Sequence, residues 1–166
     1  MELARQSTKE QKLISTHYKI INNIWPSNEK LYKWKIIQDD KCHYCNERDT
    51  VEHAMTECNE TKSFLFEVFL LIDRNKTFLY DLTPEHIIFG TENKTINTII
   101  LLLKQHISSR RCLKARLNSQ MYMKNLYIKI ISEKKFTNRT NFTLKWDQFP
   151  WLITQADSYA TELNLE

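Results

Sequence analysis

Three cysteines and one histidine within residues 42–58 have the types and spacing of metal ligands. Cys42 and Cys45 are separated by two residues, seven residues then lead to His53, and four more lead to Cys58. Two cysteines at this spacing can bind an ion from one tight turn, and the other pair can bind it from one side of a short helix. Together they supply the ligands of a closed structural zinc site. We therefore predict one structural Zn²⁺ ion in residues 42–58, which we call the knuckle.

The knuckle residues also have less specific interpretations. The four side chains could be ordinary half-buried groups, but their compact spacing and polar surroundings favour a metal. A catalytic zinc would need an open coordination position, which four protein ligands do not leave. Tyr44, between the two cysteines, could stack on an unpaired base or could shield the metal from water.

The net charge of +4 conceals a strong segregation of charge along the chain. Residues 104–145 contain eleven lysines and arginines against a single acid, Glu133, whereas residues 42–103 and 146–166 are acidic. Such a run can be a solvated helical face, but the near absence of balancing acids favours contact with phosphates. We predict backbone contacts to RNA or DNA from Lys104, Arg110, Arg111, Lys114, Arg116, Lys124, Lys134 and Lys135, together with a base-stacking contact from Tyr44.

The composition predicts helices. One glycine and three prolines in 166 residues leave little material for tight β-turns, although asparagines could support a short hairpin near the cysteines. We expect an all-α fold, in which the knuckle is inserted between N-terminal helices and a C-terminal helical bundle. The single predicted domain, 1–166, comprises a helical lead-in (1–41), the knuckle, a helical body (59–153) with the basic segment 104–145, and an acidic tail (154–166).

Local signals place the helix boundaries. Apolar spacing predicts one amphipathic helix over about 7–24, and Ser27 is a candidate N-cap for the next helix. Thr83-Pro84 and Gly90 have the types that begin and end a helix, after a loop that precedes Thr83. A long helix from about residue 92 should bury Ile96, Ile100, Leu103 and Ile107 and then present cations. Another helix should span about 118–135, and the Thr/Asn-rich residues 137–143 should form a loop.

The sequence also bears on location. It has no apolar run approaching the roughly 18 residues that cross a bilayer, and its N-terminus lacks the apolar stretch of a signal peptide. We therefore expect an intracellular protein of the nucleus or cytoplasm that does not bind membranes. In a reducing compartment, clustered cysteines favour a metal over disulfides.

The knuckle and its flanks resemble a known family. The helical lead-in, the run EKLYKWKI, the two spaced cysteines, Val51-Glu52-His53 and Cys58 are similar to the zinc-binding C-terminal region of reverse transcriptases of non-LTR retrotransposons, the long interspersed elements. The similarity extends roughly over residues 8–146, with only the knuckle being specific. Asn59 and Phe64 stand where the family often has proline and tryptophan, and the polymerase and endonuclease motifs are absent.

The resemblance implies a non-catalytic module that binds RNA or target DNA during target-primed reverse transcription. A full-length parent would resemble an RNA-directed DNA polymerase, and its polymerase part would be a further partner. An alternative is a protein-interaction module that docks onto a polymerase body, with the cations balancing charge inside the assembly. A stand-alone enzyme is the least favoured hypothesis, because no paired carboxylates, phosphate loop or nucleophile elbow is visible.

Overall fold

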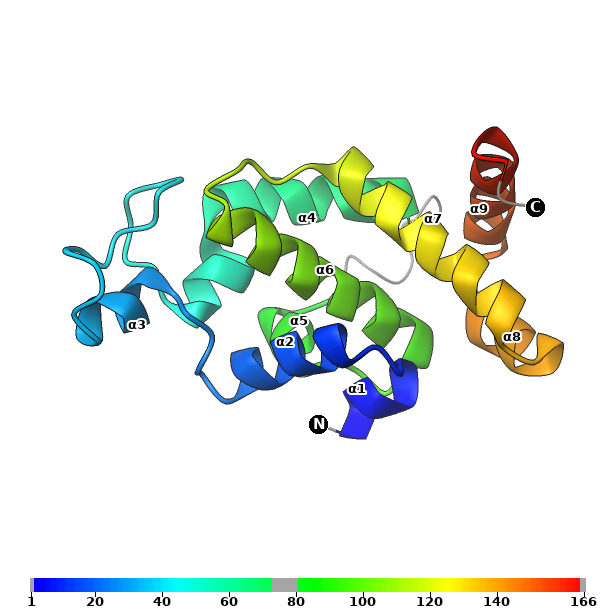
Figure 1. Ribbon diagram of the computed structural model, residues 1–166, viewed down its shortest axis with the longest axis horizontal. Helices are drawn as coiled ribbons and strands as arrows, with labels where there is room; N and C mark the ends of the chain where they lie inside the picture. The colour runs from blue at the N-terminus through cyan, green and yellow to red at the C-terminus, as the bar shows by residue number, and fades with distance from the viewer. Residues whose placement is uncertain (1, 73–80, 165–166) are drawn as a thin grey trace. The chain divides into compact units, whose positions relative to one another are not determined.

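The computed structural model describes residues 2–72 and 81–164, which form helices joined by turns (Figure 1). Within these ranges the only extended pairing is an isolated antiparallel bridge between Lys41 and Arg48. The predicted all-α fold with a Cys3His group in the knuckle is therefore confirmed. The loop predicted before Thr83 lies mostly outside the described residues.

The chain divides into two compact units, residues 1–118 and residues 119–166. The organisation of 1–166 as a single domain stays a prediction. The first unit contains α1 (Glu2–Ser7), α2 (Gln11–Ile21), α3 (Asn28–Lys33), the π-helix η1 (His53–Glu57), α4 (Asn59–Ile72), α5 (Pro84–Phe89) and α6 (Lys94–Cys112). The second contains α7 (Ser119–Phe136), α8 (Arg139–Trp146) and α9 (Pro150–Glu162).

Helix α6 forms the centre of the first unit, with α1 and α2 packed against it (Figure 1). The predicted apolar stripe of α6 is buried, as expected for a helix that faces the core: Ile96, Ile100, Leu103 and Ile107 are at most 6% exposed. Polar contacts also join α6 to the lead-in. Trp25 donates its indole N–H to Ser108 Oγ at 2.7 Å, and Thr16 Oγ1 donates to Gln105 Oε1 at 2.7 Å.

The predicted helix caps are confirmed. Ser27 Oγ accepts the Lys30 N–H at the start of α3. Thr83 forms a capping box with His86, and Gly90 ends α5 with a φ of 96°, in the region that favours glycine. Helix α6 begins two residues later than expected, because the Asn93 side chain accepts the backbone N–H groups of Thr95 and Ile96.

Two boundary predictions are wrong. The helix expected over 7–24 exists but is shorter, because α2 begins at Gln11 and ends at Ile21. A separate helix, α1, precedes it, and the chain turns between them at Thr8, whose Oγ1 accepts the Glu10 N–H at 3.2 Å. The loop expected over 137–143 is mostly α8. Asn138 caps α8 by accepting the Thr140 N–H at 2.9 Å, and Phe142 and Trp146, four residues apart, are buried. Capping and burial here outweigh the modest helix propensity of threonine and asparagine.

Acidic side chains organise the second unit. Glu133 accepts hydrogen bonds from Lys145 Nζ at 2.9 Å and from Trp146 Nε1 at 3.0 Å, which joins α7 to α8. Lys129 adds an ion pair to Glu133 at 3.2 Å. The segment predicted to be an acidic tail is helical as far as Glu162, and α9 packs against α7.

Candidate metal centre

A tight turn positions the first two candidate ligands. The Cys42 N–H donates to the Glu47 carbonyl at 2.7 Å, and the Asn46 N–H donates to the Cys42 carbonyl at 2.8 Å. Asn46 has a φ of 65°, which asparagine tolerates better than most residues. The Lys41–Arg48 bridge closes the base of this turn, so the short hairpin allowed by the sequence is reduced to one bridge.

A π-helical turn positions the other two ligands. The Cys58 N–H donates to the His53 carbonyl at 2.8 Å, which is the i→i+5 pattern of a π-helix. In an α-helix, residues five apart lie about 140° apart around the axis and would not face one ion. The wider turn brings both side chains to one side. Thr61 Oγ1 donates to the Ala54 carbonyl at 2.9 Å and satisfies a backbone acceptor within the turn.

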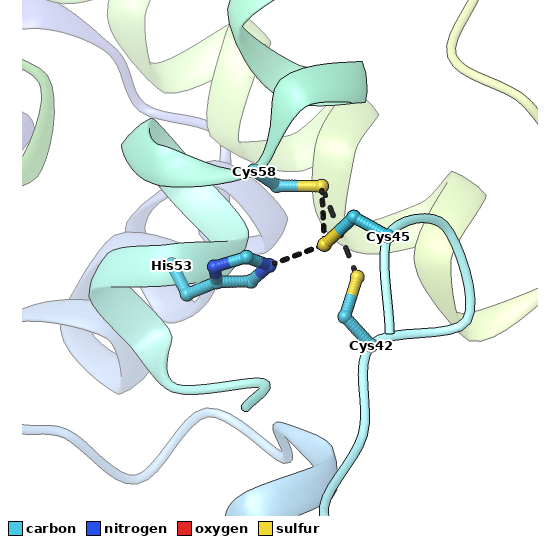
Figure 2. A group of neighbouring side chains, drawn as sticks. All are labelled: Cys42, Cys45, His53 and Cys58. Carbon is cyan, nitrogen blue, oxygen red and sulfur yellow. Dashed lines mark hydrogen bonds between the residues drawn. The ribbon is translucent and has the colours of Figure 1, made fainter. Parts of the chain in front are cut away.

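The four side chains converge on one point, as Figure 2 shows. Their ligand atoms all lie within 4.8 Å of one another. Cys58 Sγ is 3.8 Å from Cys42 Sγ and 3.9 Å from Cys45 Sγ, and Cys45 Sγ is 3.2 Å from His53 Nε2. A tetrahedral zinc with sulfur at about 2.3 Å would separate two sulfur atoms by about 3.8 Å. The residues present therefore fit a zinc ion.

The surroundings favour a thiolate at Cys42. Burial opposes ionisation of this thiol, but hydrogen bonds from the Tyr44 and Cys45 backbone, with His53 and Arg111, lower its pKa to about 6. Burial, together with the neighbouring cysteines, raises the pKa of Cys45. Zinc binds cysteine as the thiolate. Cys42 ionises readily but Cys45 does not, so the binding of the metal should release a proton from Cys45.

An arginine from α6 supports the knuckle. Arg111 Nη2 donates to Cys42 Sγ at 3.2 Å and forms a buried ion pair with Asp49. Asp49 Oδ2 also accepts the Asn28 N–H at 3.0 Å, so one carboxylate links α3, the knuckle and α6. Tyr44 lies beside the guanidinium and donates its hydroxyl to the Ala115 carbonyl. The C-terminal end of α6 is thus attached to the candidate metal site.

Several predicted nucleic-acid contacts have other roles in the structure. Lys104 is fully buried and Arg111 is 6% exposed, so neither lies on the open surface where the phosphate contacts were expected. Both lie on the side of α6 that faces the core, because Lys104 and Arg111 each follow a buried isoleucine by four residues. Lys134 is exposed but forms an ion pair with Asp157 of α9 at 2.7 Å. Tyr44 is half-buried and engaged with Arg111 and Ala115, which favours its packing interpretation over base stacking.

The remaining predicted cations are divided between the two units. Lys114 and Arg116 are exposed in the turn after α6, and Arg110 is half-buried with its Nε donating to the Arg116 carbonyl at 2.9 Å. Lys124 and Lys135 are exposed on α7 in the second unit. The basic segment 104–145 therefore belongs to both units.

Sequence reasoning missed Asp49 and His17. Asp49 has no spacing signal that distinguishes it from the nearby Asp39 and Asp40, because its partner Arg111 is 62 residues away along the chain. His17 sits on the apolar side of α2, 3% exposed, and this position on a buried stripe was the signal that could have revealed it.

Comparison with known proteins finds one similarity, which includes the knuckle. Residues 6–64 match the family described as zinc-binding in reverse transcriptase. The match spans the lead-in and the knuckle, contains all four candidate ligands, and ends in α4; Arg111 lies outside it. This family is a zinc-binding accessory domain and not a catalytic one. Comparisons with curated proteins and with solved structures gave no match.

The matched region, with its Cys3His group, is thus similar to a zinc-binding domain of the kind associated with reverse transcriptases. Among the helices in the described part of the chain, none is both long and apolar enough to span a membrane.

Proposed function

We propose that the chain is a non-catalytic nucleic-acid-binding module stabilised by one zinc ion. It belongs to the C-terminal part of a reverse transcriptase of the non-LTR type, in the nucleus or cytoplasm, and binds RNA or target DNA during target-primed reverse transcription. The polymerase part of the parent protein is a further partner. The match of residues 6–64 supports the link to reverse transcription. The exposed cations beside the knuckle support the choice of a nucleic acid as the ligand.

The observation that carries the proposal is the attachment of exposed cations to the knuckle. Lys114 and Arg116 lie in the turn after α6. Tyr44 of the knuckle donates to the Ala115 carbonyl of this turn, and Arg111 at the end of α6 donates to Cys42. Zinc would hold the three cysteines and the histidine in place, and would thereby fix the positions of these cations. A fixed pair of cations loses less side-chain and backbone freedom on binding a phosphate backbone than a flexible one.

A salt titration tests this function. Binding of the zinc-loaded chain to labelled single-stranded RNA, single-stranded DNA and duplex DNA is measured by fluorescence anisotropy from about 50 to about 300 mM salt. The logarithm of the affinity should fall linearly with the logarithm of salt concentration, by about 0.7 per phosphate neutralised on a single strand. Chelation of the metal should weaken binding. Absence of binding at low salt, or a flat salt response, would reject the proposal.

An exposed apolar surface favours a second candidate function, docking onto a polymerase body. Tyr32, Trp34 and Ile36 are 49%, 53% and 64% exposed, close together in the chain around the end of α3. Exposed clusters of this kind are common at protein interfaces. A chain that binds the polymerase part with little salt dependence, and binds no nucleic acid, would favour this candidate.

A further inference from the structure

A cleft of about 510 Å³ lies beside the knuckle in the first unit. Its lining comes from three places: the Trp25–Leu31 region, the Ile37–Asp49 region, and the end of α6 with the turn after it, from Arg111 to Lys114. The cleft volume falls within the range of about 300–1,000 Å³ that small-molecule sites occupy. It therefore has room for more than water.

The cleft has an apolar part. Trp25, Leu31 and Ile37 line it, and of these Leu31 and Ile37 are half-buried and so present apolar surface to an occupant. Ligand sites are usually walled by such side chains, with a few polar groups that fix orientation. A flat heteroaromatic ring is well suited to an apolar wall of this kind.

The cleft also has a cationic part. Lys41 and Lys114 are exposed and line it, and neither ammonium group makes a hydrogen bond or ion pair within the described residues. The acids that line the cleft are Asp39 and Asp49. Asp49 is already engaged by Arg111 and by the Asn28 N–H, and Asp39 accepts the Lys41 backbone N–H at 3.0 Å. Two cations thus face one acid that is not neutralised by an ion pair.

Arg111 supplies a further donor in the wall of the cleft. Its side chain is 3% exposed, and Nη2 is used by Asp49 and Cys42, while Nη1 has no hydrogen-bond partner. A buried donor without a partner costs about 1–3 kcal/mol. The Arg111 guanidinium also adds positive charge to this wall of the cleft.

We propose that this cleft binds one nucleotide unit of a single-stranded nucleic acid. The base lies against Leu31 and Ile37, and the phosphate lies between Lys41 and Lys114, near the Arg111 guanidinium. The inference deepens the proposed function, on which it rests, by locating a binding site that includes Lys41 and the end of α3. These elements lie outside the basic segment 104–145.

A pair of matched variants tests the cationic part. The double variant Lys41→Gln/Lys114→Gln should weaken binding to a single-stranded RNA of about 12 nucleotides about tenfold at low salt, and should make the salt slope shallower by about 0.7 for each phosphate that is no longer neutralised. The control is Lys12→Gln/Lys19→Gln, which removes two exposed lysines of α2 that have no ion pair within the described residues. It should bind RNA nearly as well as the unmodified chain. Zinc content and melting temperature should not change in either variant, because all four lysines are exposed.

Methyl NMR of the unmodified zinc-loaded chain tests the apolar part and the source of the phosphate. Adenosine monophosphate and the RNA should both shift the methyl resonances of Leu31 and Ile37. Inorganic phosphate should leave these methyl resonances unchanged, because it has no base. Salt-dependent RNA binding that leaves both residues unperturbed, or that survives in the Lys41→Gln/Lys114→Gln variant, would overturn the cleft site but not the proposed function.

The opposite result separates the two proposals in the other direction. If adenosine monophosphate shifts Leu31 and Ile37 but no strand of RNA or DNA binds, the cleft is a nucleotide site and the nucleic-acid module is rejected. Methyl shifts caused by a polymerase-derived polypeptide, in the absence of any shift with nucleotide or RNA, would overturn the cleft proposal in favour of a protein partner.

Discussion

Two buried basic side chains on α6, Arg111 and Lys104, have pKa values shifted in opposite directions. Burial disfavours the charge of Arg111, but Asp49 and Cys42 outweigh burial and raise its pKa. Lys104, two turns earlier, lies with its Nζ 2.7 Å from His17 Nδ1 and 2.6 Å from the Ile88 carbonyl, and no acid pairs with it among the described residues. Burial lowers the pKa of Lys104 to about 7. A buried cation needs an acid to remain charged; otherwise it loses its proton readily.

The first unit therefore has two regions whose stabilities should depend on different conditions, one on metal and the other on pH. The knuckle end of α6 contains a permanent charge, a carboxylate and the candidate metal ligands, so its stability should respond to metal. In the middle of α6, Lys104 lies against a second base, His17 of α2, so the stability of this region should respond to pH.

Loss of zinc should destabilise the knuckle end far more than the middle of α6. A closed structural site contributes on the order of 10 kcal/mol of apparent folding free energy at neutral pH. Cys58→Ala should therefore abolish zinc binding and remove hydrogen-exchange protection from the knuckle, with smaller losses around Ile100. Cys112→Ala is the matched control, because Cys112 is exposed and lies outside the metal group. Unchanged metal content and melting temperature in Cys58→Ala would refute the ligand assignment.

Removal of the acid at the knuckle end should be the next most disruptive change. Asp49→Ala leaves the Arg111 guanidinium buried without its counter-charge and removes the acceptor for the Asn28 N–H. A loss of about 3–5 kcal/mol in the free energy of unfolding is expected. Denaturant unfolding of zinc-saturated protein measures it. Asp157→Asn breaks an exposed pair with Lys134 and should cost less than about 1 kcal/mol. Equal losses of unfolding free energy in the two variants would show that burial does not strengthen the Arg111–Asp49 pair.

The middle of α6 should produce a pH-dependent stability. Unfolded Lys104 has its ordinary pKa of 10.5, whereas in the folded chain the pKa is about 7. Between these values the unfolded state binds the extra proton, so stability should rise with pH from about 7 to 10.5, by a few kcal/mol. Below pH 7 both states are protonated and this contribution stays constant.

The variant Lys104→Met isolates the contribution of Lys104. Its stability should depend less on pH in this window, and it should exceed that of the unmodified chain most clearly near pH 7. His17, whose pKa is lowered to about 3 by burial and by Lys104, titrates in a lower window and does not interfere. Denaturant unfolding of zinc-saturated protein at about pH 7, 8.5 and 10 measures the difference. Parallel pH profiles for the two chains would show that Lys104 is charged in the folded state.

Much of the fold could be predicted because its signals are local. Ser27, Thr83 and Gly90 cap helices through contacts within a few residues, and the stripe from Ile96 to Ile107 is a simple helical repeat. The candidate ligands also lie within 17 residues, so their spacing alone indicated a common site. The prediction of a loop over 137–143 was wrong because burial of Phe142 and Trp146 stabilises α8. This burial depends on the rest of the second unit.

The order of amino acids was enough to predict the helical class, the helix caps and the four residues that could hold zinc, since each depends on neighbours along the chain. The role of each cation emerged only from three-dimensional packing. Lys104, Arg111 and Lys114 occur in one basic segment, yet the first is buried beside a histidine, the second is paired with Asp49, and the third is exposed in a cleft. The free energy of a charge depends on its burial and on acids distant in sequence, which charge counts along a chain do not contain.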